Sequence, residues 1–193
     1  MRDMFPNITD SISLNFINSR IVRKGRLIEL VNNVKDLEAW TESPIDGNTH
    51  YNTQLSTFNS CLDNNIDIND LLEFRSELYS VLLDLLDKKI SISDFKLFIE
   101  INTLNNPFSI IFIQNTPIFV PVKSGLAGIK TLMFLDLSRL VENGDINKVS
   151  KCANDSCPLI FINKNGRRKW CSMKICGNRY KVERYENKNR ENE

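Results

Sequence analysis

Apolar residues recur at helical spacing in three long segments of the chain. In residues 70–87 they repeat every three or four positions, which predicts an amphipathic helix with one buried face. The same spacing in residues 125–142, followed by Asn143-Gly144 as a helix-ending signal, predicts a second long helix. Residues 94–104 predict a third helix, which the sequence Asn105-Asn106-Pro107 ends.

Short apolar runs between polar turns predict strands elsewhere in the chain. Residues 14–17 and 27–31 are expected to form two strands on either side of a polar turn. Residues 109–114 and 117–122 predict a hairpin with a two-residue turn, and the two prolines of its second strand are typical of a sheet edge.

The region between the first strands and the first long helix has a weaker pattern. Asn32 or Asn33 can cap a short helix that Ser43-Pro44 ends. Residues 43–69 are polar, so we expect mostly loop there, with a short helix around residues 55–61. The fold class that these elements predict is α+β, with mixed helices and antiparallel sheet.

The charges divide the chain into two regions. The 193 residues carry a net charge of +1, from 25 Lys+Arg and 24 Asp+Glu. Residues 1–147 contain 13 basic and 19 acidic residues, a net of −6, whereas residues 148–193 contain 12 and 5, a net of +7. We therefore expect an acidic α+β domain over residues 1–147 and a small basic domain over residues 148–193.

Four of the five cysteines lie in the basic region, with the spacing Cys152-x4-Cys157-x13-Cys171-x4-Cys176, and Cys61 stands alone. Two pairs of thiols can converge on one point, and zinc held by four thiolates at about 2.3 Å is the usual closed structural site. Four protein ligands leave no open position for catalysis, so we expect one structural Zn²⁺. The alternative is four buried cysteines without a metal.

The residues between the two pairs predict how the pairs meet. Residues 159–162 predict a strand, residues 163–166 an Asn-Gly turn, and Arg168-Lys169-Trp170 a returning strand. Ser172 predicts the N-cap of a helix that runs through Arg184 and carries the last cysteine. A knuckle, a hairpin and a helix in this order form a treble-clef arrangement, so we expect a small treble-clef-like zinc finger.

Residues 171–179, with the sequence CSMKICGNR, resemble the CGNR zinc finger family, which is named after the tetrapeptide at residues 176–179. Cys152-Ala153-Asn154, Phe161 and Trp170 extend the resemblance. In that family the finger follows an ABATE domain, and the proteins are described as stress-induced transcription regulators. The N-terminal region is similar to that domain at residues 14–19 (LNFINS), at Gly25-Arg26, and at Leu37 and Trp40, so the resemblance implies a bacterial DNA-binding regulator.

Eight side chains of the finger are candidates for contacts with nucleic acid. They lie on the predicted hairpin and helix: Arg167, Arg168, Lys169, Lys174, Asn178, Arg179, Lys181 and Arg184. Four thiolates and one Zn²⁺ lower the charge of the region to about +5, so the surface stays basic. In the alternative interpretation, Asn178 and Arg179 hydrogen-bond the thiolates, and residues 167–169 are a solvated hairpin. Trp170 is expected in the core of the finger.

The sequence offers no support for an enzyme. His50 is the only histidine, so there is no catalytic triad, and Gly-rich nucleotide loops are absent. Cys61 beside Leu62 is typical of a small buried hydrophobic residue. No apolar run is long enough to span a membrane, and the first residues lack a secretory signal, so we expect a cytoplasmic protein.

Two functions fit these features. The first is a DNA-binding transcription regulator, in which the N-terminal domain senses an effector that the sequence does not identify, or assembles the protein. The second is a zinc-stabilised protein-interaction or dimerisation module, whose basic face meets an acidic partner, a second copy or the acidic domain. A separate ligand-binding activity of the N-terminal domain is neither supported nor excluded by the sequence.

Overall fold

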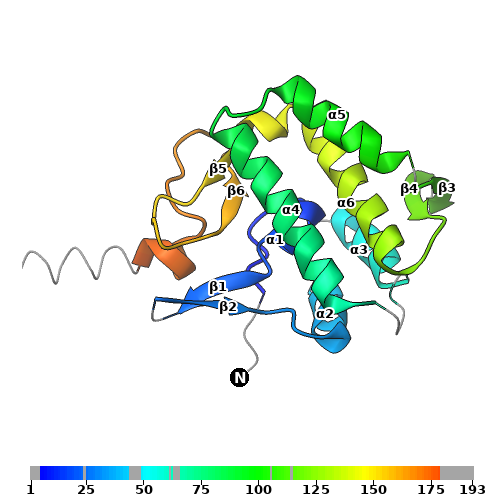
Figure 1. The fold of residues 1–193 in the computed structure, drawn as a ribbon, viewed down its shortest axis with the longest axis horizontal. Coiled ribbons are helices and arrows are strands. Elements are labelled where there is room, and N and C mark those ends of the chain that lie inside the picture. Colours follow the sequence, from blue (N-terminus) through cyan, green and yellow to red (C-terminus); the bar gives the residue numbers. More distant parts are fainter. Residues whose placement is uncertain are drawn as a thin grey trace, which may run out of the picture.

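Helices surround a buried core, and three small antiparallel sheets lie at the edges of the molecule (Figure 1). The computed structural model describes residues 5–178, apart from residues 24, 44–48, 61, 63–65, 105 and 114. Within these residues the fold is α+β, as the sequence predicts. None of the helices in the described ranges is both long enough and apolar enough to cross a membrane.

The elements follow one another along the chain as helices interrupted by hairpins. The helical elements are α1 (Ile12–Ile17), α2 (Val34–Thr41), α3 (Thr49–Ser60), α4 (Ile68–Leu86), α5 (Ile92–Thr103), α6 (Gly125–Glu142), the 3-10 helix η1 (Asp145–Lys148) and the π-helical turn η2 (Met173–Gly177). The strands pair in three antiparallel hairpins: β1 (Arg20–Arg23) with β2 (Arg26–Glu29), β3 (Phe108–Ile113) with β4 (Thr116–Pro121), and β5 (Val149–Lys151) with β6 (Ile160–Ile162).

The main core forms where α4 and α6 pack on α1 (Figure 1). All six residues of α1 are buried. Aromatic side chains link the helices around it: Phe74 of α4 and Phe134 of α6 have ring centroids 5.7 Å apart, and Trp40 of α2 contacts both Phe16 of α1 and Phe58 of α3. Such rings contribute large buried apolar areas. This cluster therefore stabilises residues 5–147, which we call the body.

The amphipathic helices and the β3–β4 hairpin confirm the predictions from hydrophobic spacing. Helices α4, α5 and α6 lie within two residues of their predicted bounds. The predicted cap of α2 is present, because the Asn33 side chain accepts the backbone N–H of Asp36. Two unpredicted caps begin the next long helices: Asp67 caps α4, and Ser91 caps α5 in a capping box with Asp94.

Residues 14–17 form part of helix α1, so the prediction of a strand there is wrong. Ser11 caps this helix, because its side chain accepts the backbone N–H of Leu14. The sequence of α1, ISLNFI, alternates apolar and polar residues as a strand does, and because the polar Ser13 and Asn15 are buried too, the spacing does not indicate a helix. The strand that precedes the polar turn is β1, and Gly25 in the turn has φ +72°.

Helix α3 is longer than the short helix expected within a polar loop. Its buried face includes Gln54 and Thr57 as well as Leu55 and Phe58. Gln54 donates a hydrogen bond from Nε2 to the carbonyl oxygen of Phe119 in β4, at 2.8 Å. Polar residues on the buried face hide the apolar period, which explains why the sequence predicts mostly loop here.

The β5–β6 pairing also differs from the expected hairpin. The predicted strand at residues 159–162 exists as β6, but it pairs with β5, and residues 168–170 form no strand. The expected turn is present: Gly166 has φ +67° and donates its N–H to the carbonyl of Asn163 at 3.1 Å. The side chain of Asn163 bonds both the N–H and the carbonyl of Arg168, so it holds the returning segment in place of a strand ladder.

Candidate metal centre and nucleic-acid surface

Strand β6 joins the body to the cysteine cluster, because its two faces belong to different cores. Successive side chains of a strand point to opposite faces. On one face, Ile160 and Ile162 join Val149 of β5 in the main core. The other face, with Phe161, belongs to a second core. This second core consists of Cys152, Leu159, Phe161, Cys171 and Cys176, with Ile8, Cys157, Trp170 and Ile175 packed against it.

The outer edge of β6 is held by the side chain of Asn18, which follows α1. Asn18 is 0% exposed, its Nδ2 donates to the carbonyl oxygen of Ile160 at 2.8 Å, and its Oδ1 accepts the N–H of Ile160 at 3.0 Å. The amide therefore bonds the strand as a neighbouring strand would. The backbone N–H and carbonyl of the buried residue Ile160 are both hydrogen-bonded. This contact fixes the finger, which we define as residues 148–178, to the body.

The first cysteine pair lies in a tight loop after β5. Cys152 donates its N–H to the carbonyl of Leu159 at 3.1 Å, and Cys157 donates its N–H to the carbonyl of Asn154 at 2.8 Å. The side-chain oxygen of Asn154 accepts hydrogen bonds from the N–H and the hydroxyl of Ser156, and these two bonds stabilise the turn of the loop. This folding brings the sulfurs of Cys152 and Cys157 to one side of the loop.

The second pair lies on either side of a helix start. The Ser172 hydroxyl accepts the N–H of Ile175, and the carbonyl of Ser172 accepts both the N–H of Cys176 and that of Gly177, each at 3.0 Å. The predicted N-cap is therefore confirmed, and Cys176 lies in the first turn. A Cβ at Gly177 would lie 2.5 Å from Sδ of Met173, so this turn fits glycine unless the exposed methionine moves.

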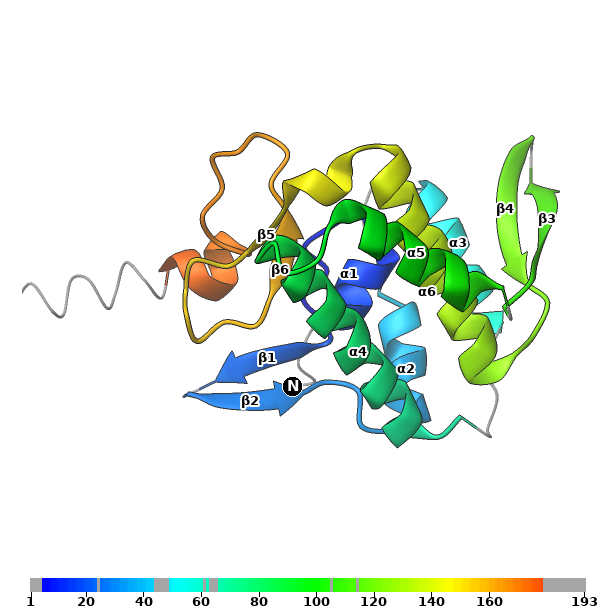
Figure 2. The ribbon, with the colours of Figure 1, turned by 45° about the horizontal axis from the view of Figure 1, so that its top comes forward.

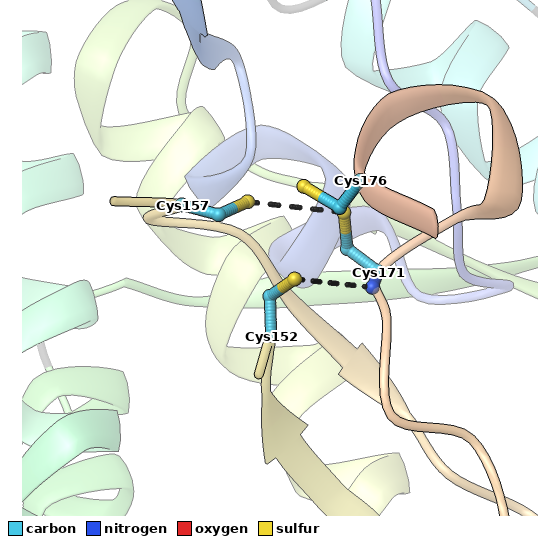
Figure 3. A group of neighbouring side chains, drawn as sticks. All are labelled: Cys152, Cys157, Cys171 and Cys176. Carbon is cyan, nitrogen blue, oxygen red and sulfur yellow. Dashed lines mark hydrogen bonds between the residues drawn. The ribbon is translucent and has the colours of Figure 1, made fainter. Parts of the chain in front are cut away.

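The four sulfurs converge on one point (Figure 3). All four lie within 4.8 Å of one another, and the sulfurs of Cys157 and Cys171 are 3.8 Å apart. Tetrahedral zinc with Zn–S bonds of about 2.3 Å needs sulfurs about 3.8 Å apart. The backbone N–H of Cys171 donates to the sulfur of Cys152 at 3.4 Å. The donor set and its spacing fit a metal ion held by four cysteines, consistent with zinc.

The protonation of the cluster follows from hydrogen bonding and burial. A hydrogen bond from Cys171 is the main cause that lowers the pKa of Cys157 to about 6. The pKa of Cys171 is raised, first because it shares this hydrogen bond with the Cys157 thiolate and then by burial. Burial raises the pKa of Cys176 to about 12. In the absence of a cation, one charge is thus favoured at Cys157, while Cys171 and Cys176 hold their protons at neutral pH.

Zinc binding is expected to strengthen steeply as the pH rises. Coordination requires thiolates, so the ion must displace protons at least from Cys171 and Cys176. With at least two protons released, the apparent association constant rises by at least about 100-fold for each pH unit near pH 7. Below about pH 6, protonation of Cys157 adds one more proton and steepens the loss. Competition with a chromogenic chelator across this range measures the slope, and an affinity independent of pH would contradict this assignment.

The structure places five of the eight predicted nucleic-acid residues, and all five are exposed: Arg167, Arg168, Lys169, Lys174 and Asn178. The remaining three, Arg179, Lys181 and Arg184, lie outside the described residues, as do Cys61 and most of the predicted last helix. Asn178 forms no hydrogen bond to a sulfur within the described part of the chain. Trp170 packs against the second core, as expected.

Arg168 differs from its neighbours, because its guanidinium serves the finger itself. It lies over the ring of Phe161, 4.4 Å from the centroid, and its Nε donates to the carbonyl of Trp170 at 2.9 Å. Burial lowers the pKa of Arg168 from its ordinary value. Arg167 and Lys169, on either side, make no ion pair with any described residue, so they remain the basic groups that the loop offers to a partner.

Two hollows flank the loop of residues 163–169. One, of about 620 Å³, lies between this loop and residues 7–10, and the other, of about 360 Å³, lies on the side of Trp170 and Met173. Arg167 and Arg168 line both. The loop is therefore a basic ridge between two recesses.

Three other basic residues of the finger are paired with acids of the body, and the first of them, Lys148, contacts Asp145 at 2.8 Å. Lys151 contacts Asp87, just after α4, at 2.5 Å, and Lys164 contacts Asp10 at 2.7 Å. These pairs are open to solvent, so each contributes little to stability. They show that the acidic body neutralises part of the positive charge of the finger, whereas Arg167, Lys169 and Lys174 have no acidic partner among the described residues.

The fold and the site define an α+β protein whose C-terminal residues form a four-cysteine module of the small zinc finger type. Residues 148–189 match the family model of the CGNR zinc finger, and this match includes all four clustered cysteines. No curated protein matches the chain.

Proposed function

We propose that the protein binds double-stranded DNA through the basic loop of its zinc finger and regulates transcription. The observation that carries this proposal is the placement of Arg167, Lys169 and Lys174, which are exposed and unpaired among the described residues, beside a rigid metal-binding core. Basic side chains on an ordered backbone suit phosphate contacts, because the loop that carries them need not become ordered when they bind.

The proposal includes one Zn²⁺ per chain as a structural ion. Cys152, Cys157, Cys171 and Cys176 would hold it, and the bound ion supplies folding free energy rather than chemistry. The body would then act as the part that senses a signal or assembles the protein, as the resemblance to ABATE proteins implies. Stress response and a cytoplasmic location belong to this same proposal.

The salt dependence of duplex binding tests the DNA contact. With three phosphate contacts, affinity for a random-sequence duplex should fall by about 40-fold between 50 and 200 mM salt. The double substitution Arg167→Ala and Lys169→Ala should remove two contacts, which lowers the slope of log K against log salt by about two. Fluorescence anisotropy with a labelled duplex measures both quantities.

The matched control is Lys35→Ala with Lys96→Ala, two exposed lysines on α2 and α5 of the body. This pair changes the net charge by the same amount and should leave the slope unchanged. Arg168 is unsuitable for this test, because its loss disturbs the stacking on Phe161. Absence of salt-sensitive binding to any duplex, or equal effects of the two double substitutions, would refute the proposal.

The ion pairs between finger and body favour a second candidate, in which the basic face serves protein interaction. Lys151–Asp87 and Lys164–Asp10 are contacts of this kind within one chain. Charge reversal at Arg167 and Lys169 separates the candidates. Loss of binding to an acidic protein partner, or of self-association, without any effect on nucleic acid would favour an interaction module.

A further inference from the structure

Strand β3 carries an unusual amount of exposed apolar surface. Every residue from Phe108 to Ile113 is exposed, Ile110 by 52% and Phe112 by 72%. The β3–β4 hairpin projects from the end of the molecule opposite the finger (Figure 2). Apolar side chains on both faces of an outer strand indicate that something covers it, because monomeric proteins seldom leave such patches open.

Only one edge of this two-stranded sheet is closed. The N–H of Val122 donates to the carbonyl of Pro107 at 3.0 Å, so these two residues form a hydrogen-bonded pair. Hydrogen-bonded and non-hydrogen-bonded pairs alternate along an antiparallel hairpin, so this contact defines the pattern for the other residues. Pro117 and Pro121, which lack an N–H, therefore lie at positions of β4 that face away from β3. The outward carbonyl of Phe119 in β4 accepts the hydrogen bond from Gln54 of α3. Prolines and α3 thus block the outer edge of β4.

The outer edge of β3 has no such protection. By the same register, the N–H and carbonyl groups of Phe108, Ile110 and Phe112 face away from β4. Among the described residues, β3 pairs with β4 alone. Natural edge strands normally carry charges, prolines or bulges that prevent pairing, whereas β3 has the sequence FSIIFI with none of these.

We propose that β3 pairs with β3 of a second copy of this chain, antiparallel and about a two-fold axis at Ile110. In this register Ile110 lies opposite Ile110, and Phe108 opposite Phe112, in the two copies. The outward-facing N–H and carbonyl groups of Phe108, Ile110 and Phe112 in one copy then meet those of the other copy. The two hairpins can therefore form one four-stranded sheet. A strand without charge suits a second copy of itself, because no like charges meet at the axis.

The exposed apolar area is large enough for a stable dimer. Helix α5 ends at the base of the hairpin (Figures 1 and 2). It carries three further exposed apolar residues, Leu97, Ile101 and Leu104. Their spacings of four and three place them on one side of the helix. These three side chains and the five apolar ones of β3 expose on the order of 800 Å² per copy, so a dimer that covers most of this surface reaches the share of one partner in a standard interface. The inference does not rest on the DNA proposal, because β3 is remote from the finger.

The test is the oligomeric state of the full chain by sedimentation velocity and light scattering. At about 50 μM the wild type should have twice the monomer mass of 22.3 kDa. Ile110→Lys and Ile110→Glu each place like charges opposite each other at the axis, and each should weaken dimerisation by at least about 100-fold. Mixing the two variants places Lys opposite Glu and should restore a heterodimer.

The matched control is Leu27→Lys, which adds a lysine at a leucine of equal exposure, 53%, on β2. It should dimerise as the wild type does, and the circular dichroism of all variants should be unchanged. A monomeric wild type at this concentration, a dimer that persists in Ile110→Lys, or failure of the mixture to associate would each overturn the proposal. Sedimentation of a monomeric wild type with phosphatidylcholine vesicles would instead assign the face to a lipid surface.

Discussion

Replacement of Cys171 by serine is expected to leave the protein without bound metal and with residues 148–178 unfolded. Cys171 is fully buried, and its sulfur and its N–H contact two of the other cysteines. In small zinc domains the metal-binding free energy, about 10–16 kcal/mol at pH 7, is also the free energy that folds the segment. Elemental analysis should find about one zinc per wild-type chain and less than about a tenth of that in the variant.

The same substitution should also destabilise the body. Val149, Ile160 and Ile162 belong to the main core, so unfolding of the finger withdraws three apolar side chains from it. Thermal unfolding followed by circular dichroism at 222 nm measures this as a lower Tm. Cys61→Ser is the control, because Cys61 is the one cysteine outside the cluster. Retention of stoichiometric zinc in Cys171→Ser, or a folded wild type that takes up none, would contradict the assignment.

Asn18→Ala is expected to lower the free energy of unfolding by roughly 2–6 kcal/mol, because it removes both partners of the buried Ile160 backbone. An unsatisfied buried donor or acceptor costs about 1–3 kcal/mol each. Asn147→Ala is the matched control, since Asn147 is exposed on η1 and should change stability by less than about 0.5 kcal/mol. Urea unfolding of both variants gives the difference.

A loss for Asn18→Ala no larger than that of the control would mean that the amide does not fix β6 to the body. The variant should also bind zinc more weakly than the wild type, because the second core is built on the far face of the same strand. Chelator competition at fixed pH measures this second effect.

The sequence predicts the elements whose surroundings differ between one face and the other. Helix α4 buries Leu71, Phe74, Leu78 and Leu82 and exposes the opposite face, so its period is visible in the sequence. Helix α1 is buried on all sides and α3 buries polar residues, so neither shows that period. Strands β5 and β6 have three residues each, so the alternation of apolar and polar residues is too short to show that they pair with each other.

Part of the candidate site can likewise be predicted from the sequence, and part of it cannot. The cysteine spacing predicts the cluster, because four thiols in two pairs are a rare combination with one common use. The role of Asn18 depends on a contact across 142 residues, and a single asparagine in an Asn-rich chain carries no signal for it. Arg168 resembles Arg167 and Lys169 in sequence, yet only the position of Phe161 beneath it shows that it stabilises the loop.

Strand β6 sets the limit of any fragment that is meant to contain the body alone. The change of charge at residue 147 suggests an obvious place to cut the chain, but the main core continues past it through Val149, Ile160 and Ile162. A fragment that ends at residue 147 would open that side of the core to water and leave the Asn18 amide without its partner. The change of charge is therefore no place to separate the body, and a stable fragment should keep the β5–β6 hairpin together with the four cysteines that hold it folded.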